Sequence, residues 1–124
     1  MQISNEPVYV TLDGCKGSNT GADYSEGQFL VKKYLSHREK NDVIRLTELL
    51  LRNIERNKDA ILFYSALSQL AFHVVECPAW WGDKGMDLFD TEPVWALMDK
   101  IYELQNPEVL KKEETTSEKT EAAK

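Results

Sequence analysis

His73 and Cys77 are the two side chains best spaced to bind a metal ion, because they lie four residues apart. Residues at i and i+4 share one face of a helix, so an imidazole and a thiolate there could reach one Zn²⁺ ion. A structural zinc site takes four ligands, and the other histidine and cysteine, His37 and Cys15, belong to distant segments. We therefore favour a core thiol beside a helix-end histidine and expect no metal, with a metal-dependent module as an alternative.

The acidic segment over residues 82–92 supplies carboxylates that could bind calcium. Their spacing is not that of an EF-hand loop, so a solvated loop that caps the next helix is the favoured interpretation. Acid–base catalysis would need carboxylates with shifted pKa values in a cleft, and the sequence shows neither. The acids of this segment are Asp83, Asp87, Asp90 and Glu92.

The sequence contains neither a nucleophile motif nor a phosphate-binding motif. Ser65 and Ser68 lie in an uncharged stretch without a G-x-S-x-G pattern, and residues 14–17 lack the spacing of a phosphate-binding loop. We therefore expect a protein that is not an enzyme, with no catalytic residues and no cofactor.

Composition narrows the classes of partner. The chain has 124 residues, which suggests one domain, and 21 acidic against 15 basic residues give a net charge of −6. This balance disfavours binding to nucleic acid or to an anionic membrane, and no apolar run approaches 18 residues. The two cysteines form no C-x-x-C motif and are expected as reduced, cytosolic thiols, with a single disulfide left open. The first residues lack the pattern of a signal peptide.

The segment Cys-Pro-Ala-Trp-Trp-Gly at residues 77–82 places two tryptophans side by side. If it is extended, adjacent side chains point in opposite directions, so one ring could fill the core while the other meets a second element or another chain. We expect this corner to be a rigid docking site. A hydrophobic plug with no partner is the alternative.

The first 24 residues are expected to form an extended, flexible arm. Val8, Val10 and Leu12 alternate with more polar positions, which is typical of a strand, and a glycine-rich loop follows. A lone strand must pair within the chain, pair with another chain or stay mobile, and the sequence shows no convincing second strand.

Residues 25–110 are expected to form a small four-helix domain, so the predicted fold class is mainly α. The third predicted helix carries no formal charge between Asp59 and Glu76 and is apolar around most of its circumference, which suggests burial on more than one side. Either it is the core helix of the bundle, or one of its faces lies in an oligomer interface, and we favour the interface. The four helices are predicted over residues 25–38, 42–57, 59–77 and 92–105.

Residues 111–124 contain little that could be buried, and we expect a disordered, charged tail.

The order of these features resembles the small tail assembly chaperones of long-tailed bacteriophages, of the siphophage type. The likeness spans about residues 5–110: an extended N-terminal segment, an acidic helical domain, the run ending in Cys-Pro-Ala-Trp-Trp, and a last helix after an acidic Asp-Leu-Phe-Asp loop. The C-P-x-W-W segment is its most specific element.

The resemblance implies a helical protein that associates with itself and coats the tape measure protein while the tail tube polymerises. It implies a host bacterial cytoplasmic location and absence from the mature virion. It also implies the tail-tube protein and a frameshift-extended form of the chain as partners. The alternative is a small helical adaptor or regulatory protein that binds a host or phage protein through the tryptophan corner.

Ten apolar residues are the predicted contact residues for self-association or a partner. They are Val8, Val10, Leu12, Phe63, Leu67, Leu70, Phe72, Trp80, Trp81 and Trp95.

Overall fold

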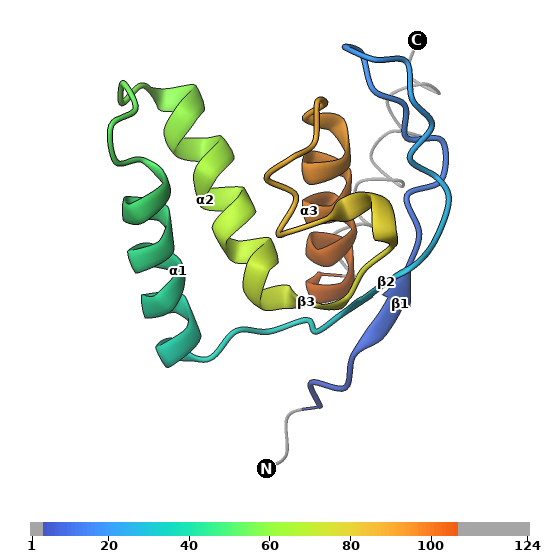
Figure 1. Cartoon of the computed structure of the whole chain (residues 1–124). Coiled ribbons are helices and arrows are strands. Elements are labelled where there is room, and N and C mark those ends of the chain that lie inside the picture. The colour runs from blue at the N-terminus through green and yellow to red at the C-terminus, as the bar shows by residue number, and fades with distance from the viewer. Residues whose placement is uncertain (1–3, 107–124) are drawn as a thin grey trace, which may run out of the picture.

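A computed structural model of the protein describes residues 4–106, which form three helices, three short strands and one 3₁₀ turn (Figure 1). The predicted disordered tail at residues 111–124 lies outside the described residues. The elements in chain order are β1 (Val8–Val10), β2 (Phe29–Val31), α1 (His37–Leu50), α2 (Lys58–His73), β3 (Val74–Glu76), the 3₁₀ turn η1 (Ala79–Trp81) and α3 (Glu92–Gln105).

The fold is α+β, and the prediction of a mainly α, four-helix domain is wrong. The strands form one antiparallel sheet in the order β1-β2-β3. The helix predicted over residues 25–38 does not exist, because β2 occupies its middle. Phe29 and Val31 are buried while Leu30 between them is half-buried, which is the alternation of a strand. Gly27, just before β2, has a left-handed φ of 87°.

Helix α1 begins at a capping box that the sequence contains. The Ser36 hydroxyl accepts a hydrogen bond from the backbone N–H of Glu39, and the Glu39 carboxylate accepts one from the backbone N–H of Ser36. Glu39 also pairs with Lys32, and this hydrogen bond lowers the pKa of Glu39. The pattern Ser-x-x-Glu therefore starts the helix five residues earlier than expected.

The hairpin between α1 and α2 is set by two asparagines. Helix α1 ends at Leu50, not at residue 57, and Asn53 follows in a left-handed conformation with φ of 65°. The side-chain oxygen of Asn57 then accepts a hydrogen bond from the backbone N–H of Ala60 at 2.9 Å and caps α2.

The chain leaves α2 at His73 and continues directly as a strand. Val74 pairs with Val31 of β2, and Glu76 pairs with Leu30. Two consecutive β-branched residues, Val74 and Val75, favour this extended conformation. The helix predicted to reach residue 77 is therefore four residues too long. In contrast, α3 begins and ends where the sequence predicted, and Val94, Leu97 and Ile101 on it are buried.

Strand β1 and the residues after it belong to the folded unit instead of forming a free arm. Strand β1 pairs with β2 along its whole length, and Leu12 is buried in the core. The core lies between the sheet, α2, α3 and Trp81, whereas α1 packs principally against α2 (Figure 1). Helix α1 and strand β1 therefore stand at opposite edges of the molecule.

A buried carboxylate, that of Asp90, ties the loop at residues 17–24 to the start of α3. Only 4 % of Asp90 is exposed. It accepts hydrogen bonds from the backbone N–H groups of Asn19 (2.7 Å) and Thr20 (3.1 Å) and from the hydroxyls of Thr20 (2.5 Å) and Tyr24 (2.5 Å). These bonds, led by that of the Thr20 hydroxyl, lower the pKa of Asp90 from 3.8 to about 2. The carboxylate is therefore ionised and almost fully satisfied at neutral pH.

This arrangement leaves no room for a side chain at residue 17, which is a glycine. A Cβ atom on Gly17 would lie 2.1 Å from Oδ2 of Asp90, far inside any normal contact. The loop can therefore close on the carboxylate only where residue 17 has no side chain.

We expect Asp90→Asn to lower the midpoint of urea unfolding at pH 7, because the amide is uncharged and offers one acceptor oxygen instead of two. Asp90 stabilises the fold above its unfolded pKa near 3.8, and this contribution is lost as pH falls toward 2. The difference from wild type should therefore shrink below about pH 4. Asp87→Asn, in the same loop but exposed, is the control and should leave the midpoint unchanged. A difference between Asp90→Asn and wild type that is independent of pH would contradict this account.

We expect Gly17→Ala to reduce the free energy of unfolding by about 1–3 kcal/mol, the usual cost of inserting atoms where there is no room. Chemical denaturation at pH 7 measures the change. Lys16→Ala, at the exposed neighbouring position, should alter stability by less than about 0.5 kcal/mol. Equal effects of the two substitutions would show that contact with Asp90 is not the cause.

Candidate protein-binding groove between the three helices

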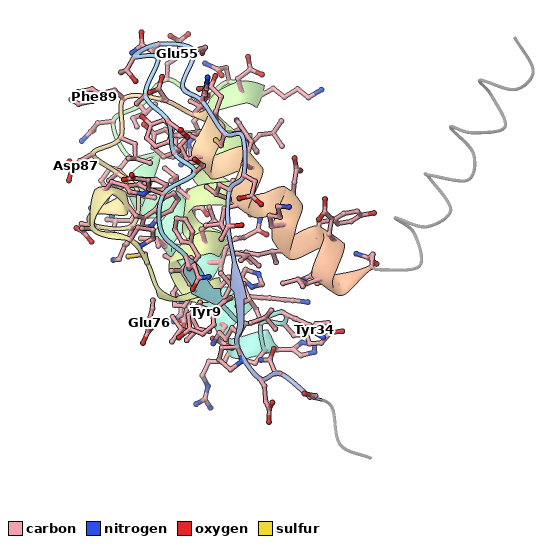
Figure 2. All side chains as sticks on the ribbon, turned by 90° about the vertical axis from the view of Figure 1, so that its right-hand side faces the viewer. Tyr9, Tyr34, Glu55, Glu76, Asp87 and Phe89 are labelled. Atoms are coloured by element: carbon pink, nitrogen blue, oxygen red, sulfur yellow. The ribbon has the colours of Figure 1, made fainter. Side chains whose placement is uncertain are left out.

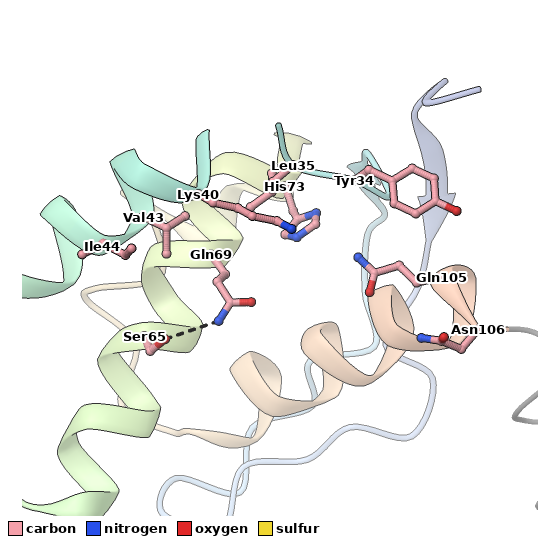
Figure 3. Close-up of a pocket in the computed structure, with 10 residues that line it drawn as sticks. All are labelled: Tyr34, Leu35, Lys40, Val43, Ile44, Ser65, Gln69, His73, Gln105 and Asn106. Atoms are coloured by element: carbon pink, nitrogen blue, oxygen red, sulfur yellow. Dashed lines mark hydrogen bonds between the residues drawn. The ribbon is translucent and has the colours of Figure 1, made fainter. Parts of the chain in front are cut away.

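A broad hollow lies where α1, α2 and α3 converge, and we call it the three-helix groove (Figure 3). Its volume is about 650 Å³. Helix α2 supplies Ser65, Gln69 and His73, and the other lining residues come from α1, the end of α3 and the segment that leads into α1. Those other residues are Tyr34, Leu35, Lys40, Val43, Ile44, Gln105 and Asn106.

His73 forms the buried end of the groove, at the last residue of α2. Its Nδ1 lies 2.7 Å from the carbonyl oxygen of Lys32, which can only accept, so Nδ1–H is the donor. Burial lowers the pKa of His73 below 6.5, and the Lys32 ammonium opposes the charged form as well. The imidazole is therefore neutral at pH 7, and Nε2 remains a hydrogen-bond acceptor.

Two glutamines give the groove polar positions on facing helices. Gln69 on α2 donates to the Ser65 hydroxyl at 3.3 Å (Figure 3). Gln105 on α3 donates to the carbonyl of Lys33 and so fixes the end of α3 against the segment after β2. The amide groups hold further donor and acceptor capacity that a bound backbone or side chain could use.

Helical spacing extends the groove beyond the residues that line its deepest part. Leu62 lies three residues before Ser65 on α2, and Tyr102 lies three residues before Gln105 on α3, so each shares the face of its neighbour. Both side chains are exposed, as is Ile44 on α1. The groove thus combines a polar floor with an exposed apolar margin, an arrangement suited to binding an amphipathic segment of another protein.

The groove shows no arrangement for covalent chemistry. Ser65 and His73 are eight residues apart on α2, about 12 Å along the helix axis, too far for a nucleophile and its base. Cys15 lies outside the groove, and burial raises the pKa of its thiol, which keeps it protonated at neutral pH. Within residues 4–106, no group of three His, Cys, Asp or Glu side chains is placed to hold a metal ion.

The candidate metal pair is separated by the fold. His73 ends α2 and is buried, whereas Cys77 follows β3 and is exposed, so the two are not one helical turn apart. Both cysteines are free thiols. The acidic segment also behaves differently from the expectation of a helix cap, because Asp90 binds the loop at residues 17–24 and Thr91 takes the N-cap position of α3 without a side-chain bond.

The tryptophan corner packs against its own chain. It is a 3₁₀ turn and not an extended segment, and its two rings flank Phe29, with centroids 5.6 Å (Trp80) and 5.2 Å (Trp81) from the Phe29 ring. Trp81 is buried, and the indole N–H of Trp80 donates to the carbonyl of Glu26 at 2.8 Å. Tyr24 completes the cluster, 5.1 Å from Trp80. This geometry favours an internal plug over a docking site for an adaptor partner.

Most of the ten predicted contact residues lie in or against the core. Leu12, Leu67, Leu70 and Trp81 are buried, and Trp95 alone among the ten is an exposed large hydrophobic residue, at 40 %. Trp95 leans on Phe63 across a centroid distance of 6.0 Å. The half-buried members are Val8, Val10, Phe63, Phe72 and Trp80.

Five exposed apolar residues that sequence reasoning missed lie on α1, the turn after it and the first half of α2. The sequence contained a signal for their exposure. Adjacent apolar residues on a helix point about 100° apart, so pairs such as Val43-Ile44 and Ile61-Leu62 cannot both face one neighbour. The missed exposed residues of this helical hairpin are Ile44, Leu49, Ile54, Ile61 and Leu62.

Comparison of the chain with protein-family models, with curated proteins and with solved structures finds no match. Within residues 4–106, none of the helices has the length and apolar character required to cross a bilayer.

We expect the stability of the protein to fall as the pH drops from 7.5 to 5. The unfolded chain binds a proton at His73 near pH 6.5, whereas the folded chain, with its lowered pKa, does not, so protonation favours unfolding. Thermal melting across this range measures the slope.

His73→Asn keeps a donor toward Lys32 but cannot titrate, and its stability should vary less with pH than that of wild type. His37→Asn changes the other histidine, which is exposed at the start of α1, and should keep the wild-type slope. A slope that persists in His73→Asn would assign the effect to another group.

Proposed function

We propose that this protein is a non-enzymatic assembly chaperone for the tail of a long-tailed bacteriophage. It associates with other copies of itself and binds the tape measure protein during tail morphogenesis. The proposal includes the tail-tube protein and a frameshift-extended form of the chain as further partners. It places the protein in the host bacterial cytoplasm and outside the mature virion. The resemblance in the sequence supplies the identity of the client, and the three-helix groove supplies a surface that could hold it.

The groove is the observation that carries the protein-binding half of the proposal. A client that is a long amphipathic helix presents apolar side chains every three or four residues. A hollow of about 650 Å³ accommodates several such side chains but not a whole helix, whose diameter is about 10–12 Å. The helix would therefore lie across the mouth of the groove with its apolar face inward.

The apolar margin and the polar floor of the groove would contact different parts of the client. Ile44, Leu62 and Tyr102 would bury apolar area on the client, which favours association. Gln69, Gln105 and Nε2 of His73 could bond to polar groups at the edge of the client helix. Such a surface binds by helix packing and tolerates different side chains, as a chaperone of an elongated client requires.

Net charge supports the same role. A net charge of −6 keeps the protein and its self-associated form soluble at the concentrations that assembly demands. Exposed apolar side chains on the α1–α2 hairpin would otherwise promote non-specific association.

Co-expression with the tape measure protein of the same phage tests the proposal, with affinity recovery of the complex as the readout. Ser65→Arg places a long charged side chain in the groove, and we expect it to reduce recovery of the client at least about tenfold. Tyr9→Arg introduces the same charge at an exposed position on β1, at the opposite edge of the molecule from α1, and should reduce recovery less than about twofold.

Circular dichroism establishes that both variants are folded. Failure of the wild-type protein to recover its client would remove the chaperone function. Equal loss in both variants would remove the groove as its site.

A further inference from the structure

Charge is distributed unevenly over the molecule. All four arginines of the chain lie between residues 38 and 56. Residues 37–58, which include α1, carry six basic and four acidic residues, a net charge of +2. The rest of the described chain, residues 4–36 and 59–106, carries five basic and twelve acidic residues, a net charge of −7. Helix α1 and the turn after it therefore form a basic side on an acidic protein.

This basic side contains a hollow of about 550 Å³ with an apolar centre, which we call the arginine hollow. Ile44 and Leu49 form the centre and are 61 % and 54 % exposed. Three arginines and one glutamate complete the lining, so the apolar centre has a charged rim. These rim residues are Arg45, Glu48, Arg52 and Arg56.

The charges at the rim are only partly neutralised. Arg56 pairs with Glu48 at 2.7 Å, and Arg45 lies 3.6 Å from Asp42 with most of its side chain in solvent. Arg52 makes no ion pair with any residue between 4 and 106. The hollow therefore favours an occupant that has an apolar group and negative charges beside it.

The acidic loop at residues 83–89 has this combination. Phe89 is 77 % exposed, the highest value among the large hydrophobic residues of the described chain, and Met86 in the same loop is exposed as well. Asp83 and Asp87 are also exposed. Figure 2 shows Phe89 and Asp87 projecting from the edge of the molecule opposite Tyr34, which lines the three-helix groove. The two surfaces therefore do not compete for one partner.

Phe89 is held in this position by the fold. The side-chain amide of Asn19 donates to the Phe89 carbonyl at 3.0 Å, and the next residue is the buried Asp90 with its four hydrogen bonds. Gly85 packs directly against the Trp81 ring at the other end of the loop. Because the backbone is held, only the rotations of the Phe89 side chain itself are lost on binding, which makes it an effective anchor.

We propose that the acidic loop of one copy docks into the arginine hollow of a second copy. Phe89 would fill the apolar centre against Ile44 and Leu49, while Asp83 and Asp87 would face the arginines of the rim. Within one chain, Asp83, Lys84 and Met86 line a separate, smaller cavity together with Leu49, and Phe89 is exposed to solvent, so the loop does not fill its own hollow. The inference rests on the self-association included in the proposed function and identifies the two surfaces that produce it.

Charge reversal tests the pairing. One variant carries Arg45→Glu and Arg52→Glu in the hollow, and the other carries Asp83→Lys and Asp87→Lys in the loop. Each alone places like charges across the contact, and we expect association at least about tenfold weaker than in wild type. An equimolar mixture of the two restores opposite charges and should recover most of the wild-type association. Light scattering coupled to chromatography, over a concentration series at low and high salt, measures the mass.

The outcomes separate the proposals. A mixture that associates no better than its components, or single variants that associate like wild type, would overturn the loop-in-hollow contact while leaving self-association intact. A wild-type protein that stays monomeric at every concentration would overturn both the contact and the self-association of the proposed function. Recovery of the client by Asp83→Lys/Asp87→Lys reports on the three-helix groove separately, because neither residue lines the groove or the arginine hollow.

The apolar half of the contact has its own test. Phe89→Ser removes the anchor from an exposed position, so folding should be unaffected, and we expect association at least about tenfold weaker. Tyr9→Ser, on β1 and 58 % exposed, is the matched control and should change association less than about twofold. Near-identical thermal melting of the two variants establishes that folding is not the cause. Wild-type association in Phe89→Ser would overturn the assignment of the anchor.

Discussion

The carboxylate of Asp90 joins segments that lie 66–71 residues apart in the sequence, and much of the fold depends on it. An ionised carboxylate removed from water needs several donors, and the loop at residues 17–24 provides four. That loop connects the edge strand β1 to the central strand β2. Because Asp90 holds this loop against the start of α3, it helps to keep the sheet packed against α2 and α3.

An aromatic cluster secures the same region from its other end. Tyr24 donates to Asp90 and also packs against Trp80, while Phe29 lies between the two tryptophans. Tyr24 therefore belongs both to the hydrogen bonds around Asp90 and to the aromatic cluster. This coupling explains why the tryptophan corner serves the interior of its own chain: its rings anchor residues 24–29, the segment that leads into β2.

The rigid sheet side contrasts with the helical hairpin opposite. Helix α1 rests mainly on α2 and leaves aliphatic side chains in solvent on both of its flanks. One flank borders the three-helix groove and the other contains the arginine hollow, and Ile44 lines both. The proposed client and the proposed second copy would therefore use neighbouring sides of one helix, so occupancy of either could influence the other.

Helices marked by nearby residues could be predicted from the sequence, whereas strand pairing and contacts between distant residues could not. Helix α3 was predicted correctly because Pro93, a periodic apolar face and Asn106-Pro107 mark its limits within a short stretch of chain. The four-residue spacing of Leu30/Tyr34 and Val31/Leu35 suggested a helix over residues 25–38, although Ser36 and Glu39 form a capping box that marks the start of α1. A three-residue strand such as Phe29–Val31 is too short to show its period, and it is stable only because β1 and β3 pair with it.

Which side chains lie on the surface also depends on tertiary structure, because it depends on how distant segments pack together. The sequence by itself determined the acidic composition, the excess of apolar residues on the helices and the concentration of arginine in one segment. It could not show which apolar residues the neighbours cover: Trp81 and Leu70 became core, while Ile44 and Phe89 were left in solvent. Burial depends on which elements pack together, and this packing is set by contacts between residues far apart in the chain.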